Sequence, residues 1–214
     1  MIWLAFVINL CHVHRMLHKL LLFVFLFSWP LALFATTFRY AQQLKLKSLP
    51  NGYEINFADG TRLCFLRTIP DSTCLAKDYL KIPVQKVATL SANQLAPFSL
   101  LGEIDRVAAH AQLNLAYRPD LNRQKVQELG YPPRLEKLLS LSTSIESPVI
   151  LANGGPTISL EGLDRAATFG LTIVPFLDYQ EKTPLARAEW LKLIGILLDK
   201  EKEAEKIFSV IEKN

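Results

Sequence analysis

Residues 148–177 read PVILANGGPTISLEGLDRAATFGLTIVPFL, and this stretch decides the fold class. Its two ends are short apolar runs, which predict buried strands over 147–153 and 171–177. Between them, residues 159–170 have the spacing of an amphipathic helix and end at Gly170, a residue typical of helix C-termini. A strand, a helix and a second strand in this order predict parallel strands joined by a right-handed crossover.

The same alternation extends in both directions along the chain. Upstream, the pattern predicts two more strands and three helices, at 86–91 and 105–111 and at 92–102, 123–130 and 132–142. Downstream, it predicts a long helix over 183–198, with Thr183 as N-cap and Pro184 at the first helical position. We therefore predict an α/β fold: a Rossmann-like parallel sheet lobe with flanking helices over 85–200.

The last segment, 201–214, predicts a further helix with one apolar and one charged face. Ala204, Ile207, Phe208 and Ile211 follow the i, i+3, i+4, i+7 spacing, and the opposite face carries Lys and Glu. An apolar face needs a partner. We expect this helix to begin a connection to a further part of the protein.

Residues 36–84 have a different pattern and predict a small antiparallel β meander before the lobe. Three alternating runs between 41 and 68 are separated by turn-forming residues at 50–52 and 59–60, and 69–83 is expected to be a loop. Cys64 and Cys74 lie in this segment. They form either a disulfide or two buried thiols, and an exported chain favours the disulfide.

Residues 1–35 have the features of a secretory signal peptide, with translation beginning at Met16. Lys19 supplies the basic start, an apolar core follows, and cleavage is expected after Ala35, which places the mature protein in the periplasm. An uncleaved membrane anchor is the alternative, although Pro30 interrupts the apolar run. Three histidines of this segment suggest a metal site, which we reject because the segment is expected to be removed: His12, His14 and His18.

Charge and motifs exclude several functions. The 214 residues carry a net charge of +4 with no long basic run, which argues against a nucleic-acid partner. The sequence has no G-x-S-x-G, no Walker A loop and no C-x-x-C. Gly154 and Gly155 follow a strand and precede a helix, where a phosphate could bind, but the dinucleotide-binding spacing is missing.

The most favourable position for a ligand is the carboxyl edge of the predicted parallel sheet, because clefts in such sheets open there. The loops at this edge carry hydrogen-bonding and aromatic side chains: Ser91, Asn93, His110, Asn114, Tyr117, Asn153 and Tyr179. They include no paired carboxylates and no nucleophile–base pair at a known spacing. This set favours a binding protein over an enzyme, with no resident cofactor and no metal ligand.

From Gln85 to the end, the order of these motifs resembles the periplasmic substrate-binding proteins of ABC importers for ferric siderophores, haem and cobalamin. The most specific part is TPLARAEWLKLIGILLDKEKEAEKIF, residues 183–208, with GLTIVPF ahead of it at 170–176. The β-rich segment also resembles an N-terminal addition found in one branch of the family. The resemblance implies a metal chelate as ligand and a permease dimer in the inner membrane as partner.

Members of that family hold their ligand between two lobes joined by a long helix. Here 201–214 resembles the start of that interlobe helix, so the resemblance implies an N-terminal lobe alone, with the second lobe missing. It also implies that Glu136, in RLEKLLSL, docks on an arginine pocket of the permease. Two alternatives stay open: a gene remnant that keeps one folded lobe, and a small exported enzyme with a phosphate site at Gly154 and Gly155.

Overall fold

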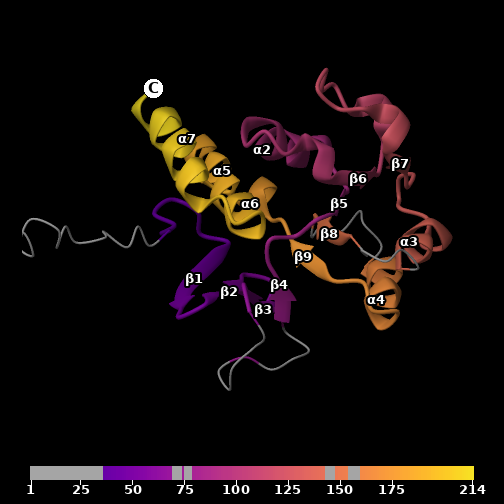
Figure 1. Cartoon of the computed structure of the whole chain (residues 1–214), viewed down its shortest axis with the longest axis horizontal. Helices are drawn as coiled ribbons and strands as arrows, with labels where there is room; N and C mark the ends of the chain where they lie inside the picture. The colour runs from indigo at the N-terminus through magenta and orange to yellow at the C-terminus, as the bar shows by residue number, and fades with distance from the viewer. Residues whose placement is uncertain (1–35, 69–73, 75–78, 143–147, 154–159) are drawn as a thin grey trace, which may run out of the picture. The chain divides into compact units, whose positions relative to one another are not determined.

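The computed structural model describes residues 36–68, 74, 79–142, 148–153 and 160–214. The described chain forms two sheets with helices packed against them (Figure 1). The predicted signal peptide, most of the predicted loop at 69–83 and the Gly154–Gly155 turn lie outside the described residues.

The first sheet has the order β1-β2-β3-β4 and occupies the β-rich segment. Its strands are β1 (Leu44–Leu49), β2 (Gly52–Phe57), β3 (Arg62–Leu66) and β4 (Tyr79–Lys81). The first three pair antiparallel, as predicted, whereas β4 runs parallel to β3 within the stretch expected to be a loop. Leu80 and Ile82 are both buried, so a short alternating pattern there was missed. The structure joins Cys64 of β3 to Cys74 in a disulfide with a Cα–Cα distance of 6.4 Å.

The second sheet is entirely parallel and confirms the predicted α/β class. Its order is β7-β6-β5-β8-β9, with strands β5 (Val87–Thr89), β6 (Val107–His110), β7 (Gln127–Glu128), β8 (Val149–Ala152) and β9 (Ile173–Pro175). The chain moves outward from β5 to β7 and then returns to the other side of β5. The gap between β5 and β8 is therefore the topological switch point, where parallel sheets place ligands.

Helices cover both faces of this sheet. The described helices are α2 (Leu95–Leu100), α3 (Leu135–Ser142), α4 (Leu160–Thr168), α5 (Pro184–Glu189), α6 (Leu191–Leu197) and α7 (Glu201–Lys213). Residues of α3 and α4 share one apolar core with alternate sheet residues such as Ala88 and Ile150. Residues of α2, α6 and α7 share the other core with Val87, Leu151 and buried residues of the first sheet. In Figure 1, α5, α6 and α7 lie next to one another.

Two helix predictions differ from the structure. Residues 123–130 were predicted as a helix, but they form the short turn η5 (Arg123–Lys125) and the edge strand β7. Val126 and Leu129 are both buried and lie three residues apart, which is also the spacing of a helix face. The backbone of residues 127 and 128 instead forms hydrogen bonds with the edge of β6. The long helix expected over 183–198 divides at Trp190 into α5 and α6, although Thr183 accepts a hydrogen bond from the Ala186 amide as a helix N-cap should.

A close contact fixes α7 against α6. A Cβ placed on Gly195 would lie only 2.5 Å from the Ala204 Cβ, a separation that real side chains do not reach. Gly195 therefore allows the two helices to approach at Ala204, which is fully buried. The face predicted from Ala204 and Phe208 is the one that packs, while Ile211 is 36% exposed.

Residues 36–43, which we call the N-terminal strap, bind to two buried carboxylates of the helical layer. Glu189 accepts hydrogen bonds from the backbone amides of residues 39, 40 and 41 at 2.7–3.1 Å. Glu181 accepts them from the amides of residues 42 and 43 at 3.0–3.1 Å, and from the Trp190 indole at 3.1 Å. Five consecutive amides are thus satisfied by side chains, although the strap itself is in no sheet.

Candidate functional site

The carboxyl ends of β5, β8 and β9 bring together most of the polar side chains predicted for the site. Ser91 and Asn93 follow β5 at the turn η2 (Ala92–Gln94), and Asn153 follows β8 directly. Tyr179 follows β9 in the turn η6 (Asp178–Gln180) and is 41% exposed. This edge includes the switch point of the sheet.

Gln94 lies at the switch point, and it was not predicted as a site residue from the sequence. Its side chain is fully buried, and Oε1 accepts hydrogen bonds from the backbone amides of Leu90 at 2.8 Å and Ser91 at 3.3 Å. Its Nε2 donates to Oδ1 of Asn153, which ties the loop after β5 to the loop after β8. Ser91 and Gln94 have the S-x-x-Q spacing of a capping box, and this signal could have revealed the residue.

Asn93 ties the same loop to the end of β9. Its Nδ2 donates to Oδ2 of Asp178, a second residue at this edge that was not predicted from the sequence. Burial raises the pKa of Asp178, and the hydrogen bond from Asn93 opposes that change. The other carboxylate oxygen, Oδ1, is buried and has no hydrogen-bond partner among the described residues.

A pocket of about 250 Å³ opens beside this pair, between α2, α5 and α7. Its polar lining consists of Asn93, Asp178 and Arg187. Its apolar walls come from Ala96, Pro97, Leu100, Phe176, Ala188, Trp190, Leu191 and Ile211. Leu100 is 52% exposed and Ile211 is 36% exposed, so apolar side chains form an open rim. A mostly apolar cavity with a few convergent polar groups is the usual form of a small-molecule site.

His110 is in a different environment from the exposed loop position that the sequence predicted. It is the last residue of β6, is 1% exposed, and its Nδ1 lies 2.8 Å from the Thr89 hydroxyl. Burial lowers the pKa of His110, because the imidazolium form cannot be solvated there. The structure therefore places this ring in the core of the sheet, beneath the candidate surface.

The remaining predicted residues occupy separate positions. Asn114 lies in the turn η4 (Leu113–Leu115) after β6 and is exposed, and Tyr117 is 80% exposed. Glu136 is an exposed residue in the first turn of α3. In the described part of the chain, no hydrogen bond joins Tyr117 or Glu136 to Asn93 or Asp178.

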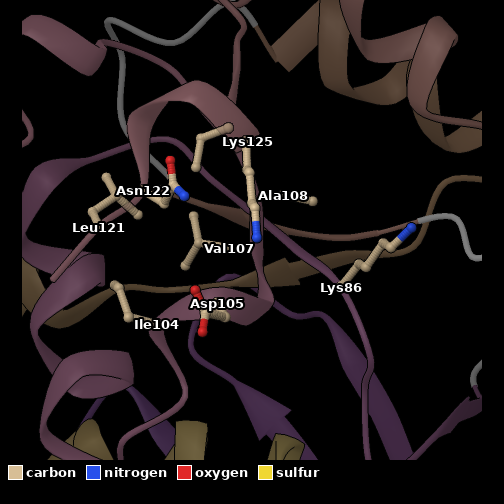
Figure 2. Close-up of a pocket in the computed structure, with 9 residues that line it drawn as sticks. Lys86, Ile104, Asp105, Val107, Ala108, Leu121, Asn122 and Lys125 are labelled. Carbon is tan, nitrogen blue, oxygen red and sulfur yellow. The ribbon is translucent and has the colours of Figure 1, made fainter.

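A second pocket, of about 340 Å³, lies at the opposite, amino-terminal ends of the strands. Figure 2 shows the polar side chains of Asp105, Asn122 and Lys125 and the apolar side chains of Val107 and Leu121, which all line this pocket. Lys86 points away from the other labelled side chains in this view. This pocket shares no residue with the carboxyl edge, so it is separate from the candidate site.

The described ranges contain neither a cluster of metal ligands nor a helix suited to cross a membrane. No three His, Cys, Asp or Glu side chains there are grouped closely enough to hold a metal ion. None of the helices in those ranges has both the length and the apolar content needed to cross a lipid bilayer.

The chain shares its fold with part of a haem-binding protein of known structure. Comparison with known protein families finds no match. A mutant of the haem-binding protein HmuT superimposes with a TM-score of 0.50 and 14% identity, over 82% of this chain and 46% of that one. The chain has the fold of about half of that protein. The predicted resemblance to one lobe of such a binding protein is thus confirmed at the level of fold.

Two further relatives have similar coverage. The petrobactin-binding protein YclQ of Bacillus subtilis is 19% identical over 60% of this chain and 44% of its own, with a TM-score of 0.49. An uncharacterized lipoprotein of Methanocaldococcus jannaschii is 22% identical over 148 residues, which is 63% of this chain and 34% of that protein. The chain therefore spans half or less of the length of the relatives it matches.

Proposed function

We propose that this chain is a ligand-binding lobe of an extracytoplasmic substrate-binding protein, which delivers an iron chelate, haem or cobalamin to an ABC importer. The observation that carries the proposal is the carboxyl edge. There, loops after β5, β8 and β9 meet at a switch point beside an open, mostly apolar pocket. The fold shared with part of a haem-binding protein supports the same ligand class.

In this proposal the polar residues at the edge hold the ligand and the lobe faces a permease. Ser91, Asn93, Asn153 and Tyr179 would contact the chelate, and the exposed Glu136 would meet an arginine of the permease. The signal-peptide pattern of 1–35 and the lipoprotein name of one relative support a location outside the cytoplasm. Residues 36–84 would be an N-terminal addition, 85–200 the lobe, and 201–214 the start of the connection to a second lobe.

Titration calorimetry tests the ligand class directly. The probes are a ferric hydroxamate, a ferric catecholate, haemin and cyanocobalamin, each added to the chain under identical conditions. We expect one class to bind, and we expect Asn93→Ala to weaken that binding by roughly tenfold, because it removes a polar contact and releases Asp178. Asn56→Ala is the matched control, since Asn56 is exposed on β2 of the first sheet.

Either of two results would contradict the proposal. The first is that no probe releases measurable heat up to its solubility limit. The second is that Asn93→Ala and Asn56→Ala change the affinity equally, which would place the ligand away from the carboxyl edge.

A further inference from the structure

We propose that the pocket at the amino-terminal ends of the strands binds a free α-amino acid with an aliphatic side chain. The carboxylate of this ligand meets Lys125 and Asn122, and its ammonium group meets Asp105. We call the cavity, which Figure 2 shows, the amino-edge pocket. It shares no residue with the carboxyl edge, so the inference goes beyond the function proposed above and does not depend on it.

Asp105 and Lys125 carry opposite charges that have no partner in the described chain. Neither side chain forms an ion pair or a hydrogen bond with another described residue, although both line the pocket. Charged neighbours in the same segments are in contrast already bound: Arg106 pairs with Glu103 at 2.5 Å, and Arg123 donates to a backbone carbonyl at 2.6 Å. An acid and a base that line one cavity without partners suit a molecule that carries both charges.

Asn122 supplies a further donor on the wall that carries Lys125. It is the N-cap of η5, and its Oδ1 accepts a hydrogen bond from the Gln124 amide at 3.2 Å. That bond fixes which end of the side-chain amide faces the backbone, so Nδ2 remains to donate to a ligand. An ammonium group and an amide N–H from one turn suit a carboxylate, which accepts several hydrogen bonds.

Buried neighbours hold both polar walls in place. Asp105 belongs to the turn η3 (Ile104–Arg106), whose first residue is 9% exposed. On the other wall, Leu121 and Val126 are buried on either side of the turn that carries Lys125. The polar side chains therefore extend from backbone that the core fixes, and a ligand does not have to order the backbone when it binds.

The charges of the pocket select a zwitterion. A ligand with only a carboxylate would be repelled by Asp105, and a ligand with only an ammonium group would be repelled by Lys125. Lys86, the remaining charged residue of the lining, points away from the other labelled side chains in Figure 2. A free α-amino acid carries both charges close together, so it pairs with each side chain and leaves neither charge opposed.

The apolar lining determines the side chain of the ligand. Ile104, Val107, Ala108, Leu121 and Val126 are all aliphatic, and no aromatic ring of the described chain lines this pocket. The volume of about 340 Å³ is at the lower end of the range for small-molecule sites, which suits a single amino acid. Leucine is therefore the probe that matches both the charges and the apolar lining.

NMR titration of the isotope-labelled chain both locates and measures the binding. The probes are L-leucine, isocaproate, which lacks the ammonium group, and isoamylammonium, which lacks the carboxylate. Because the polar side chains are exposed, each charged contact contributes a factor of about two to five in affinity. We expect leucine to bind about fivefold more tightly than either single-charge probe, and to shift the amide signals of residues 104–108 and 121–126.

Three results would overturn the inference. The first is that isocaproate or isoamylammonium binds as tightly as leucine. The second is that leucine shifts only residues outside 104–108 and 121–126. The third is that no signal shifts up to the solubility limit of leucine.

Two substitutions should each remove one half of the preference. In Lys125→Met the carboxylate of leucine loses its partner and keeps its repulsion from Asp105, so isoamylammonium should bind at least as tightly as leucine. In Asp105→Asn the ammonium group loses its partner, so isocaproate should bind at least as tightly as leucine. Each comparison is made within one variant, so a change in overall stability does not alter its outcome.

Lys202→Met and Asp59→Asn are the matched controls. Both residues are exposed on other elements, Lys202 on α7 and Asp59 in the turn after β2, so each variant should keep the preference for leucine. A wild-type preference in Lys125→Met or in Asp105→Asn would overturn the contacts assigned to that residue.

The inference and the proposed function fail in different ways. If a chelate binds but leucine does not, the proposed function stands and the amino-edge pocket does not. If leucine shifts residues 104–108 and 121–126 and no chelate binds, the amino-edge pocket stands and the proposed function does not.

Discussion

At the scale of single residues, the least expected feature is a charged cluster inside the helical layer. Lys192 has no exposed surface, and its ammonium lies 3.2 Å from Glu189 Oε1, 2.9 Å from Glu205 Oε2 and 3.0 Å from the Thr37 carbonyl. It also lies 4.4 Å from the ring centroid of Phe208. Burial of both Lys192 and Glu189 costs desolvation energy, which the ion pairs and the amides of the N-terminal strap offset.

Glu189→Gln tests this cluster. The substitution keeps the shape and one acceptor but removes the charge that balances Lys192 in the core. Loss of one partner of a buried pair costs 3–5 kcal/mol, and because Glu205 remains we expect a decrease in the free energy of unfolding of about 3 kcal/mol. Urea unfolding measures it, with the exposed Glu203→Gln on α7 as a control expected within about 0.5 kcal/mol. Similar changes for both variants would rule out the buried pair.

His110 predicts how stability depends on pH. Burial lowers its pKa in the folded state, while in the unfolded chain the pKa is near the ordinary value of about 6.5. The unfolded state therefore binds the proton more readily, and the free energy of unfolding should fall as the pH drops below about 6.5. Urea unfolding at pH 7.5 and 5.5 measures the loss. His110→Gln should be less stable overall, and its loss between these pH values should be smaller; an equal loss would exclude His110 as the cause.

At the scale of elements, the start, the middle and the end of α7 each pack against or bind a different partner. Its start packs on α6 through Gly195 and Ala204, and its middle packs through Phe208, whose ring centroid is 6.0 Å from that of Tyr40. Its end is held by the strap, since Tyr40 Oη lies 2.5 Å from Glu212 and Arg39 forms an ion pair with the same carboxylate. The strap thus covers Phe208, one residue of an apolar face that the sequence alone left without a partner.

Tyr40→Phe should loosen only the last turns of α7. The substitution removes the hydroxyl that donates to Glu212 but keeps the ring against Phe208. We expect faster amide hydrogen exchange after residue 208 and unchanged exchange in α6, because local opening follows local contacts. Tyr131→Phe, at an exposed tyrosine before α3, is the control and should change neither helix. Faster exchange throughout both helices would instead indicate a general loss of stability.

At the scale of the whole molecule, the two surfaces of the proposed binding protein should be separable. The carboxyl edge holds the ligand in this proposal, whereas Glu136 lies on α3, which packs against the opposite face of the sheet from α2 and α6. Ligand binding and permease docking therefore involve different elements, and substitutions in one should spare the other.

Glu136→Gln in the full-length protein should lower uptake of the ligand by cells that carry the importer, by roughly tenfold, because an arginine of the permease loses its charged partner. Ligand affinity measured by calorimetry should stay within twofold of the wild-type value, since Glu136 is outside the carboxyl edge. Glu128→Gln, an exposed acid on β7, is the control for uptake. A loss of affinity as large as the loss of uptake would make Glu136 a ligand residue.

The sequence by itself determined the elements whose signals are local. The apolar runs of β5, β8 and β9, the Thr183–Pro184 helix start and the turns of the first meander all depend on residues close in the chain. From their order, the parallel sheet and its carboxyl edge followed, and so did the resemblance to one lobe of a binding protein. Ser91, Asn93, Asn153 and Tyr179 could be placed at that edge for the same reason.

Only the tertiary structure decided what depends on partners far apart in sequence. Gln94 meets Asn153 and Asn93 meets Asp178 because separate loops converge at one edge, and no spacing along the chain encodes either pair. Residues 123–130 have the apolar spacing of a helix, but Gln127 and Glu128 pair with the edge of β6 as the strand β7. His110 lies in the core because β6 lies inside the sheet. Glu189 became the acceptor for the N-terminal strap across about 150 residues, since burial of its charge is stable only where amides and Lys192 surround it.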